Sequence, residues 1–278
     1  MDTETPTLDD WLAALVASHQ RLAAAVGRLN AGEVTGAAYP SEWSIAQVLS
    51  HLGSGAEIFD LFVTAGLQGT PAPGAAEFGP LWERWNTKSA EDQASDALVA
   101  DEAFLDQIGA LDEEERRRWH LSMFGGDQTL TDLLRMRLGE HAVHTWDVVV
   151  TREPDATLAA DATELLVDTL DQLVARTGRT PGPAMRVRID TDRPVRRFLL
   201  VADGENAALR SLDNVMSDPT DPTDPTDTDD TDDTDPTVAL PAEALIRLVY
   251  GRLDPAHTPT LEGDTSVIDA LRRTFPGF

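Results

Sequence analysis

The first half of the chain carries apolar residues at the three- and four-residue spacing of amphipathic helices. This spacing runs from Leu8 to Leu29 and places the apolar side chains on one stripe. A second strong stripe lies between Thr129 and Val150. The pattern predicts helices over residues 8–29, 44–65, 90–108, 129–150 and 161–175.

Polar and small residues separate these helices. Ser44 and Gln47 have the spacing of a capping box, in which each side chain bonds to the other residue's backbone N–H, so a helix is expected to begin there. The stretch 66–79 is rich in Gly, Pro and Ala and predicts a long surface crossing. An acidic run, a basic run and a Gly-Gly pair predict a polar connection over residues 111–126.

The pattern changes in the second half, where apolar and polar residues alternate with a period of two. Alternation over residues 185–189 is typical of a half-buried strand. Residues 197–212 indicate a hairpin around Gly204, and Pro241 suits the first turn of a short helix over residues 241–249. The remaining expected elements are a short strand and a final helix, at residues 238–240 and 266–275.

These two patterns predict two domains. A helical bundle is expected over residues 1–178 and a small α+β domain over residues 183–278, with the boundary in a segment rich in Gly and Pro. Within the second domain, residues 218–237 form an Asp-Pro-Thr repeat with nine Asp and no basic residue. This segment lacks the glycine turn and fixed spacing of a calcium loop, so it is interpreted as an acidic low-complexity insertion at the surface.

The composition is that of a soluble globular protein with a strong negative charge. The 278 residues are 41% hydrophobic and carry a net charge of -27. This charge argues against nucleic acid and against anionic membrane surfaces as partners. No apolar run reaches the roughly 18 residues that span a bilayer, and the acidic N-terminus does not resemble a secretion signal. A cytoplasmic location is therefore expected.

Three residues in the predicted helices could bind a metal ion. Glu140 and His144 are four residues apart, so their side chains leave one helix face about 5–6 Å apart at Cβ. His51 follows the apolar stripe of the second helix, which directs it toward the bundle interior. Two histidines and one carboxylate are the ligand set of catalytic zinc, whose fourth position stays open. Iron(II), nickel or manganese would also suit such ligands.

Structural interpretations of the same residues stay open. An isolated Glu–His pair on a helix commonly lies at the surface, and a lone histidine on a semi-apolar face is commonly a hydrogen-bonded core residue. His141 competes with Glu140, but it points about 100° away around the helix axis. The other histidines are interpreted as structural or exposed and three tryptophans as core: His19, His120 and His257; Trp43, Trp119 and Trp146.

Three segments resemble one known protein family. Residues 39–52, with their Trp-Ser and His-Leu pairs, resemble the Trp-Ser/Thr…His-Leu signature of the DinB-like superfamily. Residues 140–147 resemble the Glu-x-x-x-His-x-x-Asp signature of its mycothiol-dependent maleylpyruvate isomerase branch. Residues 240–252 resemble the C-terminal domain of that branch, which is akin to sterol carrier proteins. The resemblance covers the whole chain except the insertion.

The resemblance implies a site and two cofactors. In that family a four-helix bundle binds a divalent metal, usually zinc, and the matching positions here are His51, Glu140 and His144. The family's thiol cofactor, mycothiol, occurs in actinobacteria of high GC content, which agrees with the arginine-rich composition. A C-terminal arginine is important in the isomerase, and Arg252 is the catalytic candidate here, followed by Arg247.

A metal-activated thiol is the chemistry that these features predict. The chain has no cysteine, so the thiol must come from outside, and a cation would lower its pKa. The thiolate would add to a small electrophilic substrate, either in a cis–trans isomerisation or as an S-transferase; a non-catalytic metal- and ligand-binding module is the third alternative. Arg252 would bind a substrate carboxylate, and Asp147 either orients a ligand or faces solvent. The expected state is a monomer or a weak homodimer.

Overall fold

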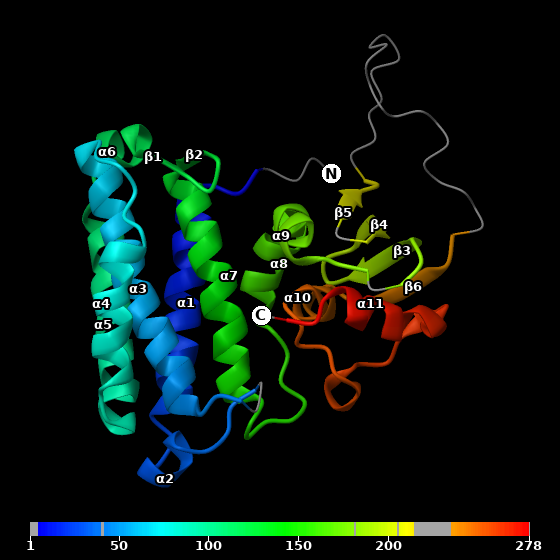
Figure 1. Ribbon diagram of the computed structural model, residues 1–278, viewed down its shortest axis with the longest axis horizontal. Helices are drawn as coiled ribbons and strands as arrows, with labels where there is room; N and C mark the ends of the chain where they lie inside the picture. Colours follow the sequence, from blue (N-terminus) through cyan, green and yellow to red (C-terminus); the bar gives the residue numbers. More distant parts are fainter. Residues whose placement is uncertain (1–4, 40–41, 181, 205, 214–234, 278) are drawn as a thin grey trace. The chain divides into compact units, whose positions relative to one another are not determined.

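The structure, a computed structural model, describes residues 5–39, 42–180, 182–204, 206–213 and 235–277. The chain divides into two compact units, residues 1–162 and 163–278 (Figure 1). The sequence-based domain limits, 1–178 and 183–278, stay a prediction. The insertion predicted at residues 218–237 lies outside the described residues, apart from its last three positions.

Four long helices form most of the first unit. They are α1 (Leu8–Val26), α3 (Ile45–Gln68), α5 (Ala90–Ala110) and α7 (Leu130–Val149), which lie side by side in Figure 1. Ser44 Oγ accepts a hydrogen bond from the Gln47 backbone N–H, and the Gln47 side chain accepts one from the Ser44 N–H, which is the expected capping box. Thr129 and Asp132 form the same box at the start of α7. The helical first domain is confirmed.

Shorter elements connect the long helices: α2 (Ala31–Val34), α4 (Ala75–Asn86), α6 (Glu113–Arg118), β1 (His120–Met123) and β2 (Gly126–Thr129). Two predicted connections are therefore wrong in part. α4 begins inside the crossing predicted at 66–79, because Glu77 accepts a hydrogen bond from the Gly74 N–H and closes the first helical turn. The polar connection predicted at 111–126 contains α6, which a capping box of Asp112 and Glu115 begins. It also contains β1, in which alternate residues such as Leu121 are buried.

The core of the first unit is closely packed around α3. This helix packs mainly against α5, while α1 packs against α7. Trp85 of α4 is only 1% exposed and lies against Gly53 of α3. A Cβ atom added at position 53 would lie 2.2 Å from the indole ring, so this contact requires glycine.

A Gly53→Ala substitution is expected to destabilise the protein by about 1–3 kcal/mol, because a rigid indole ring cannot move freely inside a packed core. Thermal unfolding followed by circular dichroism measures the effect. Gly79→Ala in α4 is the matched control, because a Cβ atom there has no neighbour within 4 Å. Equal melting temperatures for the two variants would contradict the packing argument.

A five-stranded sheet forms the second unit, with the strand order β5-β4-β3-β6-β7. The strands are β3 (Met185–Asp192), β4 (Arg196–Asp203), β5 (Asn206–Ser211), β6 (Thr237–Pro241) and β7 (Glu262–Gly263). β3 pairs parallel with β6, and the other pairs are antiparallel.

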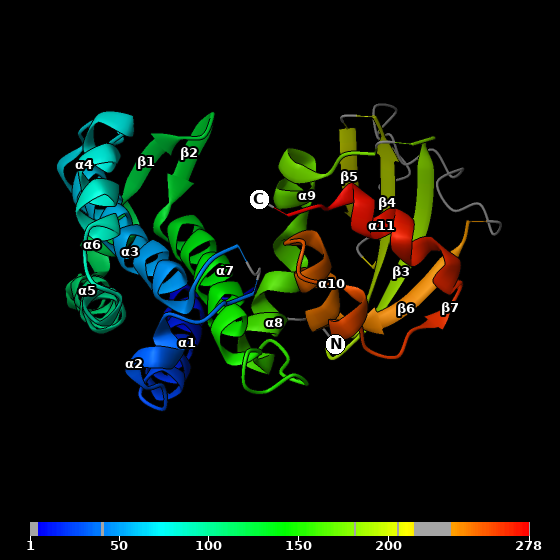
Figure 2. The same ribbon diagram turned by 60° about the horizontal axis from the view of Figure 1, so that its bottom comes forward.

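Helices accompany this sheet: α8 (Ala160–Leu166), which begins in the first unit, α9 (Leu170–Thr177), α10 (Ala242–Val249) and α11 (Ile268–Thr274). α9 packs against β5, and α10 packs against β3 and β6 (Figure 2). The predicted mixed α+β second domain is confirmed. No helix among the described residues is long and apolar enough to cross a membrane.

Candidate metal centre

Three side chains that lie far apart in the sequence meet between α3 and α7. His51 lies in the second turn of α3, whereas Glu140 and His144 lie one turn apart on α7. Glu140 Oε2 is 3.2 Å from His51 Nε2 and 3.6 Å from His144 Nε2. One ligand atom from each of the three residues lies within 4.8 Å of the other two. We call these residues the His51 cluster.

The His51 cluster has the donor set and the charge that suit a divalent cation. Two imidazole nitrogens and one carboxylate oxygen are the ligands of catalytic zinc. Within the described part of the chain, Glu140 has only the two histidines as polar partners, so neither Lys nor Arg balances its charge. The side chains of His51 and Glu140 are 38% and 39% exposed, which leaves one side accessible to a small molecule.

Asp147 orients His144 within the cluster. Its Oδ2 lies 2.8 Å from His144 Nδ1, and the Asp147 side chain is completely buried. Since this contact occupies Nδ1, it directs Nε2 of the same ring toward Glu140. Of the two alternatives for Asp147, facing solvent is wrong, and the role of orienting a ligand residue stays a prediction that this contact supports.

Hydrogen bonds and nearby charges together outweigh burial in shifting the pKa values of Glu140 and His144. Burial raises the pKa of Glu140, but hydrogen bonds and charges from His144 and His51 outweigh it and hold that pKa well below its ordinary value. Burial lowers the pKa of His144, whereas the carboxylates of Asp147 and Glu140 raise it, and the net shift is upward. The carboxylate therefore remains ionised and available as a ligand near neutral pH.

Trp43 borders the cluster instead of lying in the core. Its ring centroid is 5.5 Å from that of His51 and 6.3 Å from that of His144, with the latter pair nearly parallel at 12°. The residue is 39% exposed, so the interpretation of Trp43 as a core residue is wrong. Trp119 and Trp146 are buried as expected, and their indole N–H groups donate to backbone carbonyls.

A second group with metal-ligand residues is closed and already has a balanced charge. His19, Asp101 and His141 also place one ligand atom each within 4.8 Å of the others. However, Arg137 Nη2 donates to Asp101 Oδ1 at 2.7 Å, and the Arg137, Asp101 and His141 side chains are at most 1% exposed. A metal ion there would place additional positive charge beside a buried guanidinium. We call these four residues the Asp101 network and interpret it as structural.

The sequence does not reveal this network, although one signal was available. Asp101 is a charged residue between the core positions Ala97 and Phe104, four residues after the first and three before the second. An acidic side chain on the buried face of a helix requires a partner, because an unpaired buried charge is costly. His19 and His141 are its histidine partners, at 2.8 Å and 2.9 Å from Oδ2.

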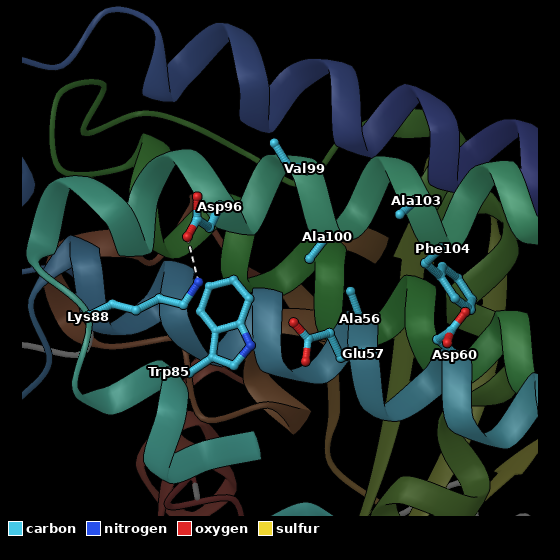
Figure 3. A pocket seen from close by; sticks show the side chains of 10 residues that line it. All are labelled: Ala56, Glu57, Asp60, Trp85, Lys88, Asp96, Val99, Ala100, Ala103 and Phe104. Atoms are coloured by element: carbon cyan, nitrogen blue, oxygen red, sulfur yellow. Dashed lines mark hydrogen bonds and ion pairs between the residues drawn. The ribbon is translucent and has the colours of Figure 1, made fainter. Parts of the chain in front are cut away.

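The first unit also contains a hollow of about 370 Å³ between α3, α4 and α5. Figure 3 shows Lys88 paired with Asp96 at one end of this hollow and Asp60 at the other. None of the residues of the His51 cluster lines the hollow. It is therefore separate from the candidate metal centre.

The candidate arginines lie on or next to α10, in the second unit. Arg252 is 5% exposed, and its Nη1 donates to the Tyr250 carbonyl at 2.6 Å. Arg247 forms a buried ion pair with Glu243 and donates to the carbonyl of His257 at 2.8 Å. Both arginines are therefore buried, and the role of either toward a substrate stays a prediction.

Comparison with known proteins identifies the first unit. The family model described as the mycothiol maleylpyruvate isomerase N-terminal domain matches residues 15–149, which include the whole His51 cluster. Residues 15–149 therefore form a domain of this family. The predicted family is thereby confirmed. No curated protein matches the chain significantly.

Solved structures extend the similarity to the second unit. A crystal structure of the mycothiol-dependent maleylpyruvate isomerase superposes with a TM-score of 0.63 and 13% identity, covering 95% of this chain and 96% of that chain. A histidine-to-alanine mutant of that enzyme gives a TM-score of 0.63 and 12% identity with the same coverage. At these identities, the similarity shows a shared fold.

Proposed function

We propose that the protein is a metalloenzyme that uses a mycothiol-type thiol to isomerise a small electrophilic substrate of the maleylpyruvate class from cis to trans. The observation that supports this proposal most directly is the convergence of His51, Glu140 and His144 within 4.8 Å. These residues would hold a divalent ion, for which zinc is the first candidate. Such an ion would lower the pKa of a thiol brought to the site.

The chain's own residues have separate tasks in this proposal. Glu140 supplies the negative charge of the ligand set, and Asp147 keeps Nε2 of His144 turned toward the site. Trp43 offers a partly exposed aromatic face beside both histidines, against which the planar part of a substrate can pack. Arg252 is the proposed partner of a substrate carboxylate, as a two-pronged cation.

The openness of the site favours catalysis over a purely structural metal. A structural zinc site is closed by a fourth protein ligand, whereas the His51 cluster offers three residues within the described part of the chain. The proposed partners are a small-molecule thiol and a small electrophile, and the proposed location is the cytoplasm. An S-transferase would need the same site, but its product would be a conjugate of the thiol with the substrate instead of the trans isomer.

The decisive test compares the full-length protein with a His144→Ala variant after metal loading. The wild-type protein should retain about one equivalent of metal and convert maleylpyruvate to its trans isomer in the presence of mycothiol. The variant should lose both, since two remaining ligands hold an ion weakly. Metal analysis by mass spectrometry and absorbance or chromatography of the product provide the two readouts.

The control for this test is His120→Ala, which removes an exposed histidine of β1 and should change neither readout. Accumulation of a mycothiol conjugate in place of the trans isomer would support the S-transferase. Full metal content and turnover in the His144→Ala variant would refute the proposed site.

A further inference from the structure

Arg137 links the two helices that carry the His51 cluster. It lies on α7, three residues before Glu140, and its side chain is only 1% exposed. Its Nη2 donates a hydrogen bond of 3.0 Å to the carbonyl of Leu52, the residue that directly follows His51 on α3. The same nitrogen donates to Asp101 Oδ1 of α5 at 2.7 Å. One guanidinium thus connects α7 with α3 and α5.

α3 accommodates the Arg137 guanidinium with a glycine and an aromatic ring. A Cβ atom at Gly55 would lie 3.0 Å from Arg137 Nη1. Apart from the neighbouring backbone of α3, no other atom of the described residues would lie within 4 Å of it. Phe59, one turn later, places its ring centroid 5.7 Å from Arg137 Cζ. Both contacts favour a guanidinium held at a defined place on α3.

The far side of Arg137 is equally constrained. Asp101 Oδ2 lies 2.8 Å from His19 Nδ1 of α1 and 2.9 Å from His141 Nε2 of α7. His141 Nδ1 in turn lies 2.9 Å from Ser18 Oγ. A displacement of the guanidinium would therefore also disturb Asp101, which contacts His19 of α1 and His141 of α7.

The contacts of Arg137 lie on the helix faces that carry the cluster. Arg137 and His144 are seven residues apart, so they share one face of α7. His51 and Gly55 are four apart and share one face of α3. The contacts of Arg137 with α3 therefore determine the position of α3 along α7. This position in turn determines the distances from His51 to Glu140 and His144.

We propose that Arg137 is a positioning residue for the metal site, which aligns His51 of α3 with Glu140 and His144 of α7. The inference rests on the proposed metal-binding function. Arg137 does not touch the ion or a substrate in this scheme. It acts through the Leu52 carbonyl and through Asp101, with Gly55 providing the space that its guanidinium needs.

Two variants of the full chain test this role, each with a different disturbance. Arg137→Met removes the guanidinium. Gly55→Ala keeps it but requires Nη1 to move away from α3 by a few tenths of an ångström. The matched control is Gly79→Ala, which adds the same methyl group to a helix where a Cβ atom has no neighbour within 4 Å.

The readouts are the dissociation constant for zinc, measured by competition with a chelator, and the visible absorption spectrum of the cobalt(II)-loaded protein. The zinc dissociation constant should rise about 10- to 100-fold in Arg137→Met and at least about 3-fold in Gly55→Ala, as for residues that support metal ligands. The cobalt spectrum should change in both variants and remain unchanged in the control. A residue that merely stabilised the fold would leave both readouts unchanged in a folded variant.

Each outcome decides the question. Wild-type zinc affinity and cobalt spectrum in a folded Gly55→Ala protein would overturn the positioning role, even if Arg137→Met failed to fold. If the wild-type protein bound zinc and both variants bound it with the same affinity and the same cobalt spectrum, the positioning role alone would be refuted. If the wild-type protein bound no zinc and no cobalt, the proposed metal site and the positioning role would both be refuted.

Discussion

Replacing Asp101 by Asn should destabilise the protein by about 3–5 kcal/mol, although the side chain keeps nearly the same shape. The Asp101 and Arg137 side chains are each 1% exposed and pair at 2.7 Å. When one partner of a buried ion pair is removed, the other stays as an uncompensated charge in a medium of low polarity. The loss should greatly exceed that of a surface ion pair.

Chemical denaturation of the full chain, followed by the helical circular dichroism signal, measures this loss. Asp9→Asn is the control, because Asp9 pairs with Arg116 at 2.9 Å while its side chain is 79% exposed. A surface pair of this kind contributes at most about 1 kcal/mol. Similar losses for the two variants would show that the Asp101 network does not hold the bundle together.

The effect of Asp101 should also depend on pH in a definite direction. Burial raises the pKa of Asp101, but His141, Arg137 and His19 outweigh it and hold the pKa well below the ordinary value of 3.8. A carboxyl group with a lowered folded-state pKa stabilises the protein above its unfolded pKa and loses that contribution as the pH falls through the folded pKa. The difference between wild type and Asp101→Asn should therefore be largest near neutral pH and decrease below about pH 4.

Local patterns predict the long helices well, because their signals lie within a few residues. Ser44 and Gln47 cap α3 as their spacing indicates, and the stripe that ends near Val150 matches α7. The shorter elements are harder to predict. α4 begins in a segment whose Gly and Pro content indicates a loop, and its core residue Trp85 depends on a contact with Gly53 that only the fold creates.

The candidate site was partly predictable for a similar reason. The spacing of Glu140 and His144 places them on one face, and the apolar stripe before His51 directs that residue toward the bundle interior. The resemblance to the family then groups the three residues. The proximity of His51 to the other two residues depends on the tertiary structure, since His51 and Glu140 are 89 positions apart in the sequence. The exposure of Trp43 and the link from Arg137 to α3 likewise depend on how helices pack, which apolar periodicity does not encode.

A Glu140→Gln substitution should weaken zinc binding by about 100- to 1000-fold. This range corresponds to one ligand's share of the roughly 10–16 kcal/mol with which four ligands hold structural zinc. Glutamine retains the size of the side chain and an oxygen near both histidines, so the substitution removes the charge selectively. The loss should be large because Glu140 is the anionic member of the His51 cluster and no described Arg or Lys is paired with it.

Competition with a chelator measures the zinc affinity, and circular dichroism verifies that the variant is folded. The control is Glu83→Gln on α4, which makes the same chemical change at an exposed position outside the cluster and should leave the affinity unchanged. If folded Glu140→Gln protein bound zinc as tightly as the wild type, the ion would be held elsewhere. In that case the thiol would not be activated at the His51 cluster, and the proposed isomerisation would need a different site.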